Sequence, residues 1–460
     1  MGKLQNLDRD KMDFEKGKIG PLFRALFFPT LTAMIFNSVL AVIDGIFVGH
    51  GVGPIGLAAV NIIAPMFMIC TGIGLMFGIG ASVIASIRLS ENNDKAAKII
   101  MTQSFVVGTL VILLIAIISL LFPRMVAGLL GATDELMPGA TAYLRNMIPG
   151  APFLLFQCIG MMLIRLDGSP KFAMWCEVVP ALINIVLDYI MVFPLGMGVA
   201  GAALATTISC VIGGIMVIAY FIWHSDRLKF YRLKTSLTSI VLTLRNTWYM
   251  IKIGFATFLS ECAMSVMMIT GNFVFLERMG EDGVAAFSIA CYLFPVVFSI
   301  SNAVAQSAQP IISYNYGAHH DERIIRALKV ALITAISCGL IVTAILCLGD
   351  KFIVGAFISS KEPAFAFACH GLPLFAICAV FFAVNITFIG YYQSIEAAGK
   401  STLYTLLRGI VFLVPSFLTL PMLLGDNGAW LTIPVAEILT FMVIVSVFIN
   451  KHNNKKTIQV

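Results

Sequence analysis

The chain has 460 residues, of which 59% are hydrophobic and only 12% are charged, and its formal net charge is +6 at pH 7. Soluble domains carry about 25% charged residues, so this composition excludes a soluble globular protein and indicates a polytopic membrane protein. The positive charge does not indicate a nucleic-acid partner, because the basic residues fall in particular loops between apolar segments.

Residues 1–20 are polar and mixed in charge, and no cleavable signal peptide is visible in them. We expect a cytoplasmic amino-terminal segment, followed by a first spanning helix that directs its own insertion. Apolar runs of about 20 residues or more then predict twelve membrane-spanning helices. The predicted helices cover residues 22–49, 56–86, 99–122, 140–164, 171–195, 200–223, 248–276, 284–314, 325–348, 364–392, 401–424 and 428–450.

The distribution of Lys and Arg supports this number of spans. The amino terminus, every second loop and the carboxyl-terminal tail together hold 22 of these residues, whereas the opposite loops hold 4. Basic residues accumulate on the cytoplasmic side of a membrane. The count therefore predicts a multi-pass protein of the cell membrane with both termini in the cytoplasm, because an odd number of spans would break the alternation.

A hydrophilic stretch, HSDRLKFYRLKTS, divides the chain nearly in half, and the two halves are similar. GLAAVNIIAPMFMICTGIG (56–74) aligns with GVAAFSIACYLFPVVFSIS (283–301), and a charged turn follows each of them. An even number of spans separates these segments, so the repeat predicts two pseudo-symmetric six-helix bundles with a substrate site between them. The expected parts are a first lobe at 21–223, a cytoplasmic linker at 224–247, a second lobe at 248–450 and a cytoplasmic tail at 451–460.

Two acidic residues of the first half lie inside predicted spans. Asp44 is the only acid between residues 18 and 91, and an ionised side chain within a membrane is costly unless it has a function. Asn184 and Asp188 are four residues apart, so they lie on one helix face. Carboxylate and amide oxygens suit Na⁺, and neighbouring acids can share a proton. The three residues therefore predict a site for a cation or a proton.

The next predicted span begins with GAALATTIS, in which Thr206 and Thr207 offer hydroxyl groups to the same site. A threonine in a spanning helix often bonds the carbonyl one turn earlier instead. An alternative interpretation places Asp44 and Asp188 at the membrane surface, where a carboxylate needs no special role.

The second half offers Glu261 and Glu437 as further acids inside spans. Arg408 lies in the eleventh predicted span, and pairing with Glu437 across neighbouring helices would give both a structural role. Glu261 has no partner that the sequence indicates. Glu177, seven residues into the fifth span, is interpreted either as a cytoplasmic-side gate or as a side chain that extends to the membrane surface.

Motifs of soluble enzymes are absent from the sequence. There is no Walker loop, the ten cysteines form no C-x-x-C pair, and His319 and His320 lie in a predicted loop. We therefore expect a protein that is not an enzyme and that has no cofactor, zinc site or disulfide framework. An ion gradient is the expected source of energy.

Three stretches together resemble the multidrug and toxic compound extrusion (MATE) transporters over essentially the whole chain, and in particular the bacterial branch that includes the MepA-like drug exporters. The stretches are DGIFVGHGVGPIGLAAVN (44–61), DGSPKFAMWCEVVPALINIVLDYIMVFPLGMGVAGAALATTIS (167–209) and SYNYGAHHDERIIRA (313–327). The resemblance implies two six-helix lobes that face a central cleft. It also implies export of cationic, amphipathic small molecules in exchange for Na⁺ or H⁺.

The resemblance also implies which residues form the site. The acid of the seventh helix in this family falls on Glu261. Some members have a second acid in the tenth helix, but here that span contains none, and Asn385 is its nearest polar residue. The cation site of the first lobe in this family falls on Asp44, Asn184, Asp188 and Thr206, so we expect the coupling ion in the first lobe. If the ion is Na⁺, we expect Asp44, Asn184 and Asp188 to hold it. We also expect the protein to be a monomer.

Two other functions fit parts of the sequence. Flippases for lipid-linked saccharides share the architecture, but they line the cavity with several Arg or Lys residues, and here only Arg408 lies clearly within a span. Intramembrane prenyltransferases hold Mg²⁺-diphosphate with two Asp-rich motifs, and NIVLD (184–188) resembles half of one, with no second motif in the chain. The acids of the first half favour a cationic cargo.

Overall fold

The computed structural model of this chain describes residues 12–457, and its regular structure in that range is entirely helical. Eleven helical stretches among these residues are long and apolar enough to cross a membrane. One of them, α9 (Leu237–Gly317), has 81 residues and joins the predicted spans 248–276 and 284–314. A straight helix of that length would measure about 120 Å. Gly280, whose φ is 66°, interrupts α9, so its two parts cross separately. The prediction of an all-α polytopic membrane protein is confirmed.

The helices of the first half follow one another with short turns, and the fourth predicted span consists of three consecutive pieces. Their bounds are α1 (Ile19–Val52), α2 (Pro54–Ser90), α3 (Asp94–Leu121), α4 (Pro123–Leu129), α5 (Met137–Met147), η1 (Ile148–Gly150), α6 (Ala151–Leu166), α7 (Pro170–Val192), α8 (Gly198–Ala219) and η2 (Tyr220–His224).

The second half contains two spans that are divided in a similar way. The tenth predicted span is formed by α12 and α13, and the eleventh contains a π-helical turn, η3, between α14 and α15. After α9, the bounds are α10 (Asp321–Leu348), α11 (Asp350–Phe357), α12 (Pro363–Ala376), α13 (Cys378–Ser394), α14 (Ala398–Leu406), η3 (Leu407–Val411), α15 (Leu413–Leu424) and α16 (Asp426–Thr457).

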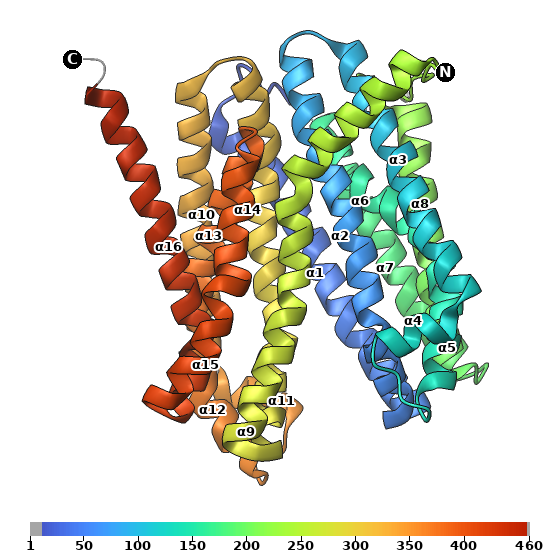
Figure 1. The fold of residues 1–460 in the computed structure, drawn as a ribbon, viewed down its shortest axis with the longest axis vertical. Coiled ribbons are helices and arrows are strands. Elements are labelled where there is room, and N and C mark those ends of the chain that lie inside the picture. Colours follow the sequence, from blue (N-terminus) through green and yellow to red (C-terminus); the bar gives the residue numbers. More distant parts are fainter. Residues whose placement is uncertain (1–11, 458–460) are drawn as a thin grey trace. The chain divides into compact units, whose positions relative to one another are not determined.

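The helices gather in two compact units, and α9 contributes to both (Figure 1). Unit 1 comprises Met1–Phe258 and Gln309–Ile324, and unit 2 comprises Leu259–Ala308 and Ile325–Val460. In unit 1, α7 packs against α1 and α8, and α2 packs against α3 and α6. In unit 2, α16 packs against α12, α13 and α15. The division into lobes at residues 224–247 stays a prediction.

Within unit 1, α9 crosses α2 with the two backbones in direct contact. A Cβ atom at Gly80 would clash with the carbonyl group of Met250, and a Cβ atom at Gly254 would clash with the carbonyl group of Met76. Each glycine lies one turn after the methionine of its own helix, so the contact is reciprocal. Small residues allow such close approach of helices in a membrane, where packing rather than water drives their association.

Candidate functional site

The site predicted for the first half lies where α1, α7 and α8 meet. Val48, Val192 and Ala202, one from each helix, form a buried apolar cluster. Each of them lies one helical turn from a predicted site residue, because residues four apart share a helix face. Gly51 brings α1 close to α7, since a Cβ atom there would clash with the side chain of Val192. This packing determines the position along the three helix axes at which their polar residues come together.

Two carboxyl groups meet at this level. Asp188, on α7, is completely buried, and Asp44, on α1, is partly buried. The two carboxyl groups lie close enough to interact electrostatically. Two ionised carboxylates repel each other and are both hydrogen-bond acceptors, so the two side chains can form a hydrogen bond only when one of them carries a proton. Asp188 is therefore enclosed by protein rather than exposed to solvent, while its depth in the membrane stays a prediction.

The pair lacks the hydrogen-bond donors that normally stabilise buried carboxylates. Among the described residues, no N–H or O–H group donates to either oxygen of Asp188 or to Oδ1 of Asp44. The buried amide nitrogen of Asn184, one turn away on α7, also has no partner in this part of the chain. Burying an ionised group without partners costs several kcal/mol. The arrangement therefore suits a proton or a bound cation, and turning the Asn184 amide would present its oxygen as a further ligand.

Tyr143 lies beside the candidate site, and the sequence reasoning did not include it. It lies on α5, is buried, and its hydroxyl contacts Thr206 on α8. It also interacts electrostatically with Asp44 and Asp188. A buried tyrosine hydroxyl needs a partner, and that was the available signal, although the sequence did not indicate which helix supplies it.

The two candidate threonines have different roles. The hydroxyl of Thr206 donates to the carbonyl of Ala202, one turn earlier, at 3.1 Å, and it also contacts Tyr143. Thr207 instead donates to the carbonyl of Asn146 at 2.6 Å, which fastens α8 to the end of α5. Thr206 therefore lies with Tyr143 at the candidate site, whereas the hydroxyl of Thr207 is engaged by the end of α5.

Glu177 lies apart from this cluster on the same helix. Eleven residues separate it from Asp188, which is about 16 Å along α7. Its Oε2 accepts a hydrogen bond of 2.8 Å from Nδ2 of Asn37, and it interacts electrostatically with the buried Arg165. Glu177 thus joins α1, α6 and α7, and it is not a ligand of the site around Asp188.

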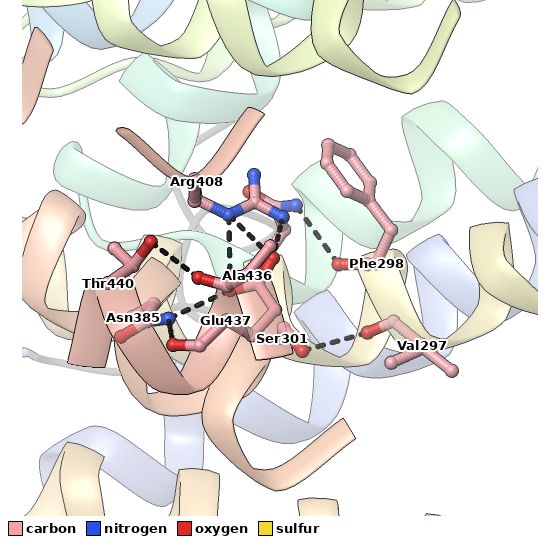
Figure 2. A network of polar contacts seen from close by, with 9 residues as sticks. Val297, Phe298, Ser301, Asn385, Arg408, Ala436, Glu437 and Thr440 are labelled. Carbon is pink, nitrogen blue, oxygen red and sulfur yellow. Dashed lines mark hydrogen bonds and ion pairs between the residues drawn. The ribbon is translucent and has the colours of Figure 1, made fainter. Parts of the chain in front are cut away.

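In unit 2, Glu437 forms a buried salt bridge with Arg408 (Figure 2). Nη2 and Nε of Arg408 lie 2.8 and 3.1 Å from Oε1 of Glu437, and Nδ2 of Asn385 donates to Oε2 at 2.8 Å. The guanidinium also lies over the ring of Phe382, with Cζ 4.3 Å from its centroid. Glu437 is therefore neutralised by an adjacent cation, in contrast to the carboxyl pair of unit 1.

The π-helical turn η3 places Arg408 for this contact. Gly409 allows η3 to pack closely on α9, because a Cβ atom there would lie 2.5 Å from Cβ of Ala263. Glu261, two residues earlier on α9, is partly exposed and forms no hydrogen bond or ion pair with any other described residue. It remains a candidate acid, whereas Glu437 has the geometry of a structural partner of Arg408.

Metal-binding side chains are sparse elsewhere. Searching the described residues finds no group of three or more His, Cys, Asp and Glu side chains that could hold a metal ion. All ten cysteines have free thiols. Among the described residues, the candidate site for a cation is the mixed set of carboxyl, amide and hydroxyl groups around Asp188.

Several known proteins are similar to this chain. A multidrug export protein MepA from Staphylococcus saprophyticus is 26% identical over 408 residues, which cover 88% of each chain. A solved structure described as the outward-facing conformation of a multidrug resistance MATE family transporter of the MOP superfamily has a TM-score of 0.89 and 23% identity, and the match covers 98% of this chain and 100% of that one. A MOP superfamily transporter from Pyrococcus furiosus, whose description reports a reversed polarity of its binding pocket, has a TM-score of 0.86 and 23% identity, with 95% and 97% covered.

The family model MatE matches residues 29–190 and 256–418, which is well over half of the chain. The two matched segments are of nearly equal length, as the internal repeat predicts. The solved structures share the fold at this level of identity, and the family consists of membrane transporters rather than enzymes. This multi-pass membrane protein belongs to the MatE family.

Proposed function

We propose that this protein exports amphipathic, mostly cationic drugs or toxic metabolites in exchange for an inward flow of H⁺ or Na⁺. The observation that carries the proposal is the pair Asp44–Asp188, in which both oxygens of Asp188 and Oδ1 of Asp44 are buried and receive no hydrogen bond from the described residues. A carboxyl pair without donors releases and takes up a cation more readily than one that is already neutralised by an arginine. The relatives named as multidrug export proteins support the same direction of transport.

The pair gives the protein two forms with different charge. With a proton or Na⁺ bound, the buried negative charge is reduced, and the helices α1, α7 and α8 can pack around the pair without a large penalty. With the cation released, the repulsion between the carboxylates favours exposure to water or to a cationic drug. Alternating access then couples the two forms to opposite sides of the membrane, provided that cargo and cation do not occupy the same form together.

The ligand chemistry supports both coupling ions. Carboxylate, amide and hydroxyl oxygens are hard ligands that suit Na⁺, whereas two neighbouring carboxyl groups suit a shared proton. The test is efflux of a fluorescent cation such as ethidium from proteoliposomes in which a Na⁺ gradient and a pH gradient are imposed one at a time. We expect one gradient to drive efflux against a concentration difference, and the failure of both would contradict coupled export.

The charge of the cargo needs its own test, because one fold can serve different functions. The salt bridge of Arg408 with Glu437 leaves little positive charge for a diphosphate in unit 2, which argues against the flippase alternative. Expression in a host that lacks its own exporters should raise tolerance to ethidium. Unchanged sensitivity, with the protein well expressed, would argue against drug export.

A further inference from the structure

Residues 227–252, named here the basic segment, join η2 to the part of α9 that crosses the membrane. The segment contains no acidic residue, and its six basic side chains are all exposed. The formal net charge of the whole chain is also +6, so the excess of positive charge is concentrated in this short stretch. The six residues are Arg227, Lys229, Arg232, Lys234, Arg245 and Lys252.

The length of α9 places much of this segment outside the hydrocarbon core. From Leu237 to the break at Gly280 the helix measures about 64 Å at 1.5 Å per residue. The hydrocarbon core of a bilayer is about 30 Å thick. Residues 253–276 alone span about 36 Å, which is enough for the crossing. The first four turns of α9 therefore precede the crossing and lie at the edge of the membrane.

These first turns nevertheless expose an apolar stripe. Leu237, Val241, Leu244 and Trp248 are 84%, 59%, 64% and 65% exposed. Their spacing of three and four residues places them on one face of the helix. A continuous apolar stripe of this kind is unfavourable in water, so it indicates a surface that is normally covered.

The opposite face of the same turns is fixed to the protein. Nδ2 of Asn246 donates to Oε1 of Gln103 at 2.9 Å, and Nε2 of Gln103 donates to Oγ1 of Thr243 at 2.8 Å. Gln103 lies on α3, so α9 is anchored through this face in unit 1. The apolar stripe therefore points away from the packed side of the helix.

Basic side chains lie along one edge of the stripe. Arg245 and Lys252 are seven residues apart, so they stand nearly in line, beside Val241 and Trp248. A helix with an apolar stripe, flanking bases and an exposed Trp has the pattern of a helix that lies in the membrane interface. Trp side chains prefer this level of the bilayer.

We propose that the basic segment binds the headgroups of anionic phospholipids, while the apolar stripe lies at the boundary of their acyl chains. The positive charge of the basic segment indicates that the bound lipid is anionic. A lipid with an uncharged headgroup would cover the apolar stripe but would leave the six basic side chains without counterions. Anionic lipids attract basic residues near a membrane surface strongly enough to raise affinity about fivefold for each Lys or Arg. The site is distinct from the carboxyl pair and does not depend on the identity of the cargo.

The test is lipid binding to the purified full-length protein in detergent, measured by native mass spectrometry. The probes are phosphatidylglycerol, phosphatidylcholine and glycerol 3-phosphate. The variant is Lys234→Gln/Arg245→Gln/Lys252→Gln. The control, Arg124→Gln/Lys351→Gln/Lys361→Gln, removes the same charge from exposed side chains outside the segment.

We expect phosphatidylglycerol to bind more tightly than phosphatidylcholine, glycerol 3-phosphate to bind weakly, and the segment variant to lose on the order of 100-fold in affinity for phosphatidylglycerol. The control should retain the affinity of the unmodified protein. The proposal would be overturned if phosphatidylglycerol and phosphatidylcholine bound with equal affinity, or if the segment variant and the control lost the same affinity for phosphatidylglycerol.

A second measurement covers the case in which the triple variant folds poorly. Phosphatidylglycerol brominated near the headgroup end of its acyl chains should quench the fluorescence of Trp248. Trp248→Phe should then reduce the total quenching, because this side chain is 65% exposed on the stripe. Unchanged quenching in Trp248→Phe would place the stripe away from the lipid and would also overturn the proposal.

Discussion

Two buried acids of this protein have opposite surroundings, so removing their charge should have opposite effects. Among the described residues, Asp188 receives no hydrogen bond from any N–H or O–H donor, whereas Glu437 receives three short ones, two from Arg408 and one from Asn385. Asp188→Asn keeps the shape of the side chain and removes a charge that costs several kcal/mol to bury. The free energy of unfolding should therefore stay the same or rise.

Glu437→Gln is the matched comparison. It leaves the guanidinium of Arg408 buried without its counterion, and breaking a buried pair in this way costs about 3–5 kcal/mol. Thermal unfolding of both variants in the same detergent measures the difference. If Asp188→Asn is as strongly destabilised as Glu437→Gln, the carboxyl pair of unit 1 is structural, and our interpretation of its missing donors is wrong.

The same Asp188→Asn variant tests the coupling. One charge moving through roughly 150 mV provides about 3.5 kcal/mol. At about 1.4 kcal/mol for each factor of ten, this energy supports a gradient of roughly 300-fold for a neutral cargo. In proteoliposomes with an imposed ion gradient, the variant should still let drug equilibrate but should lose accumulation against a gradient. Full uphill efflux by both Asp188→Asn and Asp44→Asn would refute the site and direct attention to Glu261.

Three further predictions concern other parts of the molecule. Tyr143→Phe should lower the affinity for the coupling ion about two- to tenfold, which corresponds to the loss of one hydrogen bond. The measurement is the ion concentration that gives half-maximal efflux, and an unchanged concentration would show that Tyr143 is not part of the site. Gly51→Ala should lower the free energy of unfolding by about 1–3 kcal/mol because it crowds Val192, whereas Gly20→Ala, with open space around it, should not; equal effects would contradict the close packing of α1 and α7. A cysteine at Lys234 should be labelled by an impermeant thiol reagent only from the cytoplasmic side, and labelling from outside would reverse the predicted orientation.

The sequence predicted the helices well, because apolar length is a strong signal in a membrane protein. Each of the twelve predicted spans is helical in the structure, although the fourth, tenth and eleventh are each made of consecutive helical pieces. The π-helical turn at Leu407–Val411 and the joining of two spans in α9 were not foreseen, since both depend on backbone geometry that apolar periodicity does not encode.

The site was predictable in part. Helical spacing placed Asn184 and Asp188 together, the isolated acid within an apolar span indicated Asp44, and the family resemblance selected Thr206 from the two candidate threonines. Tyr143 was missed because its partners lie on other helices, and no spacing within its own helix relates it to them. The difference between Asp188 and Glu437 was equally invisible in sequence, since it depends on whether an arginine from another helix reaches the carboxylate.

The backbone contact between α2 and α9 has a consequence for the variation that this protein can tolerate. Gly80 and Gly254 each occupy a position where even a methyl group would meet a carbonyl of the other helix. Ridges and grooves of side chains normally hold two helices at one crossing angle, and a contact between bare backbones lacks that interlock. The contact therefore fixes the distance between the two helices more strictly than it fixes their crossing angle, so the helices can rotate relative to each other about this point. In a mutational scan, variants with any substitution at either glycine should be depleted, whereas neighbouring lipid-facing positions on the same helices should accept many substitutions.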